Sequence, residues 1–167
     1  MGDLDKSIAD YTEAIRIEPK YANAYQGRGY TNFEMGNFAE AASDLLHLFD
    51  LRTAPAPYPT LWRFLALRRT GEDGVAELSD SMAKLKTTKW PYPVMEFFVG
   101  KRTMADMKSA ASNTDEKCET EFYSGEWYLL GGDKAEAKKA FEAALQICPK
   151  SFIEYSGARA ELNRLKP

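Results

Sequence analysis

The residue types that carry most acid–base, metal and redox chemistry are scarce in this sequence. Its 167 residues include one histidine, His47, and two cysteines, Cys118 and Cys148. A general base needs a nucleophile or a water path beside it in a pocket, whereas His47 has the spacing of a helix-surface residue. The inventory also lacks a histidine pair for a metal and a Cys-x-x-Cys redox motif. We therefore predict no catalytic residue, no metal, no cofactor and no enzymatic activity.

The composition is that of a folded chain and argues against a nucleic-acid partner. Hydrophobic residues make up 44% of the sequence and charged residues 28%, as in ordinary globular domains. The formal net charge of -3 argues against a general nucleic-acid binder. No apolar run approaches the roughly 18 residues of a membrane helix, so no membrane span is expected.

The sequence repeats itself with a period of 34 residues. Gly2-Asp3-Leu4 aligns with Gly36-Asn37-Phe38 at this period, and a third copy begins at Gly132-Asp133-Lys134. The third copy lies 96 residues after the second, six short of three full periods, so the array is interrupted between them. Repeats of this length are typical of helical solenoids.

Each copy carries the signals of two helices joined by a tight turn, most clearly over residues 118–149. Gly131-Gly132 is expected to end the first helix, and Asp133 stands three residues before Glu136 as an N-cap pair. Pro149 then ends the second helix, because proline cannot continue it. Small residues opposite large ones allow two such helices to interlock closely.

At these residues the chain resembles the tetratricopeptide repeat (TPR) family. Residues 121–128 through Pro149 carry the resemblance, as do residues 25–29 through Ala41. The first 19 residues resemble the second helix of a repeat whose first helix is absent. The resemblance implies an all-α fold, a right-handed α-solenoid of helical hairpins with a distorted middle and a C-terminal capping helix.

The expected organisation is one TPR-like domain over residues 1–167. Its segments are a half repeat at 1–21, a repeat at 22–52, a degenerate repeat at 58–86, two short irregular helices at 92–112, a repeat at 115–149 and a capping helix at 151–165. The proline-rich segment 53–59 is expected to be a loop. Two further capping pairs are predicted, Thr103 with Asp106 and Ser151 with Glu154. In the last helix, Tyr155, Ala158, Leu162 and Leu165 are expected to face inward, and Arg159, Glu161 and Arg164 outward.

The order of elements after residue 92 is also similar to the C-terminal part of the NlpI-type bacterial lipoproteins. Those are periplasmic TPR adaptors that bring proteases or cell-wall hydrolases to their clients. The similarity rests on the short apolar helix at 94–100 and the hairpin that follows, and the chain departs from the pattern because no lipidation cysteine stands near its N-terminus. It implies an accessory role in a bacterial envelope complex, and it slightly favours the periplasm over the cytoplasm for a protein whose compartment is otherwise unknown.

In TPR arrays the first helix of each hairpin lines a concave face that takes extended peptides. By register, the resemblance implies a groove presenting Asn23, Gln26, Tyr30, Phe33, Arg63, Leu67, Phe122, Glu126 and Trp127. One subset of the family grips a C-terminal carboxylate with Lys, Asn and Arg, and that set is missing at the corresponding positions here. Aromatic anchors favour a hydrophobic peptide or partner helix instead. The alternative is that Phe33, Phe64, Tyr123 and Trp127 only fill the space between neighbouring hairpins.

Cys118 begins the first helix of the last hairpin, and Cys148 ends its second helix. Antiparallel helices place these two ends side by side, and a disulfide needs Cα atoms within roughly 7 Å. A bond would indicate an oxidising compartment. Two small buried thiols are the alternative.

From these observations we predict that the protein is a protein–protein interaction module, a scaffold or adaptor that holds a peptide or partner helix in its concave groove. One alternative is homo-oligomerisation, including a homodimer, through the N-terminal edge. There Leu4, Ile8, Tyr11 and Ile15 form the apolar side of the first helix. Another is an accessory subunit of an envelope peptidase or hydrolase complex, with the chemistry supplied by the partner.

Overall fold

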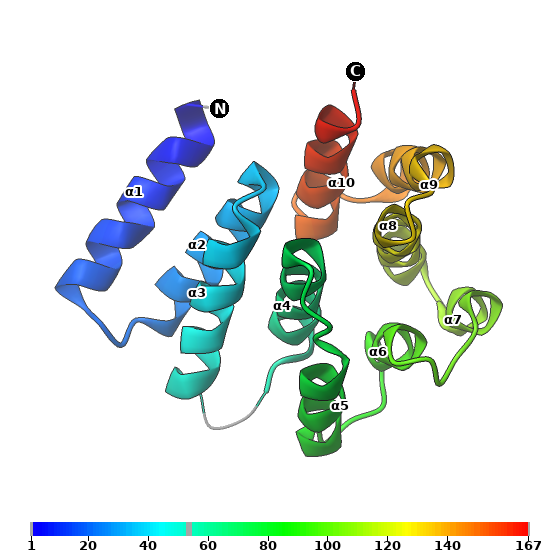
Figure 1. The fold of residues 1–167 in the computed structure, drawn as a ribbon, viewed down its shortest axis with the longest axis horizontal. Helices are drawn as coiled ribbons and strands as arrows, with labels where there is room; N and C mark the ends of the chain where they lie inside the picture. The colour runs from blue at the N-terminus through cyan, green and yellow to red at the C-terminus, as the bar shows by residue number, and fades with distance from the viewer. Residues whose placement is uncertain (1, 53–54, 167) are drawn as a thin grey trace. The chain divides into compact units, whose positions relative to one another are not determined.

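The described part of the chain, residues 2–52 and 55–166, consists of helices joined by turns and short loops, with no strand among these residues (Figure 1). This computed structural model divides into two compact units, residues 1–85 and 86–167. Each unit is described by itself below. The predicted all-α class of helical hairpins is confirmed.

The described residues of the first unit form five helices that follow one another along the chain. They are α1 (Gly2–Ile17), α2 (Ala22–Met35), α3 (Phe38–Leu51), α4 (Pro57–Thr70) and α5 (Val75–Lys84). Helix α1 packs on α2, α2 on α3, α3 on α4 and α4 on α5. Helices α2 and α4 end at Gly36 and Gly71, whose φ angles of 87° and 93° lie in the left-handed region. Glycine adopts this conformation without a Cβ penalty, and the chain can therefore reverse within a few residues.

Five helices also form in the second unit over residues 86–166, the part of it that the structure describes. They are α6 (Tyr92–Phe98), α7 (Met104–Ala110), α8 (Thr114–Leu130), α9 (Lys134–Ile147) and α10 (Ile153–Arg164). Helices α8 and α9 form its main hairpin, and α10 packs on both of them. Side-chain caps fix two of the helix starts as predicted. Thr103 and Asp106 form a full capping box at α7, and Asp133 accepts a hydrogen bond from the Glu136 amide at α9.

Interlocked aromatic and aliphatic side chains build the core of each unit. In the first unit the fully buried residues include Phe33, Leu45, Leu48, Leu61, Trp62 and Leu65. In the second unit they include Met95, Met107, Phe122, Tyr123, Phe141 and Ala144. The small residues of each first helix admit a large side chain of the second, because Gly29 faces Leu45 and Gly125 faces Phe141.

Two local predictions are wrong. The proposed loop at 53–59 lies partly outside the described residues, and α4 begins inside it at Pro57. Proline is accommodated in a first helical turn because the amide it lacks has no partner there. The capping pair of Ser151 and Glu154 does not form either, since α10 begins at Ile153 and the Glu154 carboxylate is buried and accepts a hydrogen bond from Tyr123 at 3.2 Å.

The orientation of α10 also differs from the prediction. Glu161, predicted to face outward, is buried, and its carboxylate pairs with Arg164 at 2.5 Å. Ala158 is buried as expected, whereas Leu162 and Leu165 are only half-buried. The helix therefore leaves part of its leucine side uncovered.

Candidate interaction surface

In the first unit, three of the predicted groove residues form a stripe along α2. Asn23, Gln26 and Tyr30 are spaced by three and four residues, which places them on one helix face. Asn23 is exposed, while Gln26 and Tyr30 are half-buried. Arg52 donates a hydrogen bond to the Gln26 side-chain carbonyl at 2.9 Å, and the Tyr30 ring lies 5.2 Å from Trp62. The stripe therefore presents the exposed amide of Asn23, the Gln26 amide that Arg52 orients and the half-buried ring of Tyr30.

Two other residues predicted for this groove belong to the core. Phe33 is fully buried between Phe38 and Trp62, with ring centroids at 5.1 and 4.8 Å. Leu67 is also buried, and it packs against Gly74 just before α5. Their side chains are therefore not available to a partner, as the space-filling alternative predicts for Phe33.

Arg63 is a structural cation and not a groove residue. Its guanidinium forms a two-pronged ion pair with the Glu77 carboxylate of α5 and donates to the Ala42 carbonyl of α3. The side chain is mostly buried, so these contacts hold three helices together. Helical register gives the face of a residue but not its neighbours, so the sequence alone does not indicate these contacts of Arg63.

In the second unit, α8 buries two of its three predicted groove residues. Phe122 packs against Tyr123 and Phe141, with centroids 5.1 and 6.0 Å away, and it is fully buried. Glu126 is fully buried as well. Trp127 differs from both, because 43% of its surface is exposed.

Trp127 lies on an aromatic base that α6 supplies. Its ring centroid is 4.7 Å from Phe97 and 6.1 Å from Phe98, both in tilted arrangements that aromatic pairs favour. Both phenylalanines are buried. The Trp127 ring therefore packs against the protein on one side and is exposed to solvent elsewhere. The sequence pattern predicts a short apolar helix at 94–100 but does not connect it with Trp127. We call Trp127, Phe97 and Phe98 the indole platform.

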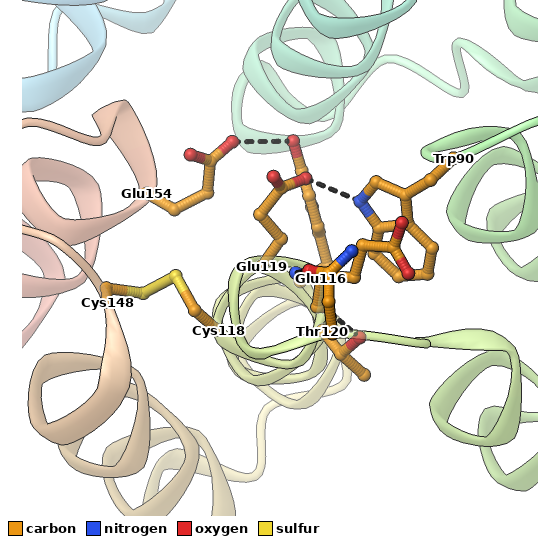
Figure 2. Close-up of a disulfide and its surroundings, with 9 residues drawn as sticks. Trp90, Glu116, Cys118, Glu119, Thr120, Cys148 and Glu154 are labelled. Atoms are coloured by element: carbon orange, nitrogen blue, oxygen red, sulfur yellow. Dashed lines mark hydrogen bonds between the residues drawn. A yellow bond between two sulfur atoms is a disulfide. The ribbon is translucent and has the colours of Figure 1, made fainter.

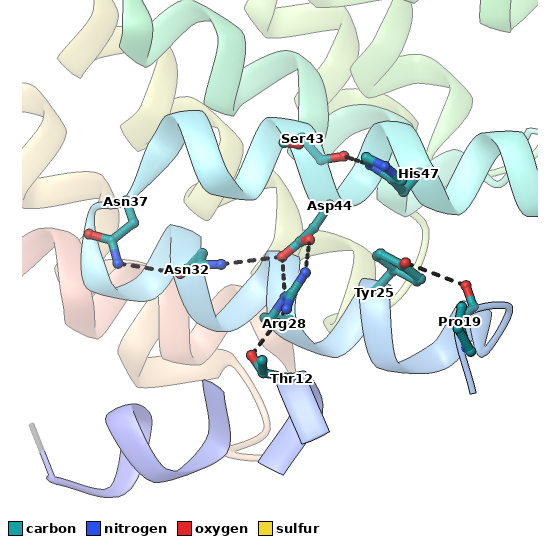
Figure 3. Close-up of polar contacts among 9 residues, drawn as sticks. All are labelled: Thr12, Pro19, Tyr25, Arg28, Asn32, Asn37, Ser43, Asp44 and His47. Carbon is teal, nitrogen blue, oxygen red and sulfur yellow. Dashed lines mark hydrogen bonds and ion pairs between the residues drawn. The ribbon is translucent and has the colours of Figure 1, made fainter. Parts of the chain in front are cut away.

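A polar network ties α1, α2 and α3 together beside the α2 stripe (Figure 3). Arg28 makes two hydrogen bonds to the Asp44 carboxylate, at 2.7 and 2.9 Å, and a third to Thr12 at 3.0 Å. Asn32 also donates to Asp44, at 3.3 Å. The hydrogen bond to Asp44 raises the pKa of the Arg28 guanidinium. Since every strong polar group here has an internal partner, the network fixes α1, α2 and α3 relative to one another.

The single histidine lies at the surface of the first unit. His47 is exposed on α3, stacked on Tyr25 at 5.4 Å, with its Nδ1 3.0 Å from the Ser43 carbonyl. Among the described residues, no three His, Cys, Asp or Glu side chains gather in a group suited to a metal ion. None of the described helices is both long and apolar enough to cross a membrane.

The two cysteines are joined by a disulfide in the second unit (Figure 2). Cys118 near the start of α8 bonds to Cys148 at the end of α9, with the Cα atoms 4.9 Å apart. Both side chains are buried. On the same helix, Glu119 accepts a hydrogen bond from the Trp90 indole at 2.7 Å, so α8 also holds the segment that precedes α6.

Helical hairpins with a glycine in one helix facing a large side chain in the next define the class of helical-repeat proteins. Two segments of the chain match family models of one such repeat. Residues 1–36 match the model described as TPR repeat, and residues 119–151 match the model described as tetratricopeptide repeat. These two segments of the chain are tetratricopeptide repeats.

The first matched segment contains α1 and α2, and the second contains most of α8 together with α9. Repeats of this family generally mediate protein–protein interaction and are typically non-enzymatic scaffolds. Both matches concern the repeat only. The similarity to the NlpI-type lipoproteins, and the periplasmic location that it favours, stay predictions.

Proposed function

We propose that this protein is an adaptor that binds a hydrophobic peptide or partner helix through the indole platform of α8 and α6. The observation that carries the proposal is the exposure of Trp127, 43% of its surface, above two buried rings. A large aromatic side chain held rigidly at the surface loses little conformational entropy on binding, and such residues dominate the energetics of interfaces.

The α2 stripe is a second contact surface of the same kind, in the first unit. Asn23 offers an exposed amide, and the hydrogen bond from Arg52 orients the amide of Gln26. Amides arranged along a helix suit the backbone of an extended peptide, whereas an exposed ring suits an apolar side chain. Of the nine groove residues predicted from the sequence, the proposal therefore keeps Asn23, Gln26, Tyr30 and Trp127.

A selection experiment tests the proposal even though the partner is unidentified. Random peptides displayed on phage are selected on the intact protein, and synthetic copies are then titrated by fluorescence anisotropy. We expect Trp127→Ala to weaken the binding of the selected peptides by tenfold or more, which corresponds to about 1.4 kcal/mol or above. Ile147→Ala is the control, because Ile147 is 39% exposed but lies at the end of α9, outside the indole platform and the α2 stripe.

Two results would overturn the assignment of the site. Peptides that bind Trp127→Ala and the unchanged protein with equal affinity would show that the platform is not the binding surface. Loss of binding in Ile147→Ala alone would move the site to the end of α9. Circular dichroism of both variants checks that helix content is unchanged.

Homo-oligomerisation through α1 is the second candidate function. No residue of α1 is buried, and Ile17 at its end is 70% exposed. Apolar groups at the edge of a repeat array favour contact with another chain. Light scattering over a range of concentrations tests this function, and a constant monomer mass up to millimolar protein would rule it out.

The disulfide supports a function in an oxidising compartment, because such bonds are rare in the reducing cytosol. An accessory role in an envelope peptidase or hydrolase complex is compatible with that compartment. Co-purification with such an enzyme under native conditions, lost in Trp127→Ala, would support this narrower function. An enzyme that co-purifies equally with both proteins would contradict it.

A further inference from the structure

Helix α6 carries the two phenylalanines of the indole platform, yet it contains little that fixes its own position. It is seven residues long, and helices this short are unstable in isolation because too few hydrogen bonds offset the cost of nucleation. No side chain caps its first turn. Its position therefore depends on tertiary contacts, which α7 and α8 supply in this unit.

One face of α8 makes contacts with α6 and with the residue two positions before it. Glu119, Tyr123 and Trp127 are spaced by four residues, so their side chains lie on one side of α8. Glu119 accepts a hydrogen bond from the Trp90 indole at 2.7 Å (Figure 2). The Tyr123 and Trp127 rings lie 6.2 and 6.1 Å from Phe98. These contacts span about 12 Å along α8, the helical rise between Glu119 and Trp127.

The hydrogen bond between Trp90 and Glu119 is the directional contact of this set. A donor that meets a carboxylate makes a stronger bond than a neutral pair, and Glu119 is buried, where water competes little for the bond. Aromatic rings, in contrast, attract one another in several offset and tilted arrangements. The bond therefore fixes where the chain enters α6, whereas the ring contacts alone would permit α6 to slide along α8.

The connection between Trp90 and α6 is short and stiff. Pro91 follows directly as the N-cap residue of α6, and its ring fixes its φ angle. The Tyr92 amide donates to the Lys89 carbonyl across Trp90, and the Val94 amide donates to the Pro91 carbonyl, both at 2.9 Å. The position of the indole is therefore passed on to the first turn of α6 and, through the helix, to its two phenylalanines.

We propose that Trp90 and Glu119 are positioning residues of the indole platform, and that their hydrogen bond holds α6 where Phe97 and Phe98 support Trp127. This role rests on the function proposed above and adds to it a pair of residues that act through Trp127. Without the bond, α6 shifts along α8 and the Trp127 ring loses the side against which it packs. A partner must then immobilise the indole on binding, which lowers the affinity.

Peptides selected on the intact protein provide the first readout, by fluorescence anisotropy. Trp90→Phe removes the indole donor and keeps an aromatic ring, and we expect it to weaken peptide binding by roughly threefold to tenfold. Glu119→Ala should have a similar effect, whereas Glu119→Gln keeps an oxygen that accepts from Trp90 and should recover most of the affinity. The double change Trp90→Phe and Trp127→Ala should bind no more weakly than Trp127→Ala alone, because Trp90 acts through Trp127.

Lys108→Met is the matched control, because it removes a polar contact of α8 with α7 and none with α6. The Lys108 Nζ atom lies 3.0 Å from the Glu121 carboxylate, and the pair is partly exposed, so its loss should change peptide affinity by less than about twofold. A second readout needs no peptide. In isotopically labelled protein, nuclear Overhauser contacts between the Trp127 indole and the Phe97 ring should weaken in Trp90→Phe and persist in Lys108→Met.

The positioning role is wrong if Trp90→Phe leaves the contacts between Trp127 and Phe97 unchanged, or leaves peptide affinity unchanged while Trp127→Ala weakens it. Losses that add in the double change would show that Trp90 does not act through Trp127. An equal loss in Lys108→Met would indicate general loosening of the unit. Failure of the proposed function is recognised separately, since Trp127→Ala would then bind the selected peptides normally, and the ring contacts would still show whether Trp90 positions α6.

Discussion

Gly125 on α8 faces the ring of Phe141 on α9, and a Cβ at this glycine would lie 2.5 Å from the ring. Both residues are buried. The absence of a side chain therefore sets the distance between the two helices, and the phenylalanine fills the space that it leaves. The same relationship links Gly29 and Leu45 in the first unit, where a Cβ would be 3.0 Å from the leucine.

We expect Gly125→Ala to destabilise the protein. In an exposed helix this change would stabilise by roughly 1 kcal/mol, but here the new methyl group overlaps the Phe141 ring, and overpacking costs about 1–3 kcal/mol. Urea unfolding followed by circular dichroism measures the net effect. The second change Phe141→Leu, which removes the overlapping ring atoms, should recover part of the loss. A Gly125→Ala protein as stable as the original would show that α8 and α9 can move apart to accept the methyl group without loss of stability.

Asp44→Asn should lower the free energy of unfolding by about 2–3 kcal/mol, because it removes the negative charge and one of the two oxygens that accept from Arg28, and it sets an NH2 donor against the guanidinium. Asp44 is almost entirely buried, and Arg28 largely so. Glu13→Gln is the control, since the Glu13–Arg16 pair is exposed and its loss should matter far less. Equal effects of the two changes would contradict the assignment of Asp44 to the packing of α2 against α3 (Figure 3).

Intact protein analysed without reductant should weigh two hydrogen atoms less than its fully reduced form, because Cys118 and Cys148 are bonded. The double change Cys118→Ser and Cys148→Ser should lower stability by roughly 3–4 kcal/mol, the chain-entropy value for a loop of about 30 residues. Detection of two free thiols in protein from an oxidising compartment would contradict the bond.

The start of α8 should become less stable in acid. The Ser112 amide donates to the Glu116 carboxylate at 2.6 Å and the Ser112 hydroxyl at 2.8 Å. These bonds lower the pKa of Glu116 below its ordinary value of 4.5. Because the folded state favours the ionised carboxylate, its contribution is present above pH 4.5 and is lost as the pH falls through the lowered pKa.

Urea unfolding at several pH values tests this sign. The stability difference between the unchanged protein and Glu116→Gln should be largest near neutral pH and should shrink below pH 4.5. Ser112→Ala removes only the hydroxyl donor and should give a smaller difference with the same pH dependence. A stability difference that grows as the pH falls would contradict a lowered pKa of Glu116 in the folded protein.

The sequence predicts the hairpins because their determinants are local. Gly131-Gly132, Asp133 and the small residues opposite Phe141 lie within one 34-residue period, and turn chemistry and helical spacing are enough to place them. Thr103 and Asp106 are predictable for the same reason. These parts of the fold therefore follow from residues close together in the chain.

The candidate site is harder to predict because its determinants are distant in the sequence. Helical register places Arg63 on a groove face, yet its carboxylate partner Glu77 is on the next helix and turns the side chain inward. The family resemblance likewise assigns Phe122 and Trp127 to one groove, although α9 buries the first and α6 only supports the second. The family resemblance indicates which helix face lines the groove, and tertiary packing determines which side chains on that face stay exposed.

The indole resonances of the three tryptophans provide the most direct test of the central claim. Peptide obtained by selection on the protein is titrated into isotopically labelled protein, and the indole N–H signals are followed by NMR. Trp62 is buried and Trp90 donates its indole N–H to Glu119, whereas Trp127 is exposed. We predict a saturable shift of the Trp127 signal with the other two unchanged. A stationary Trp127 signal at full occupancy of the peptide would contradict the account.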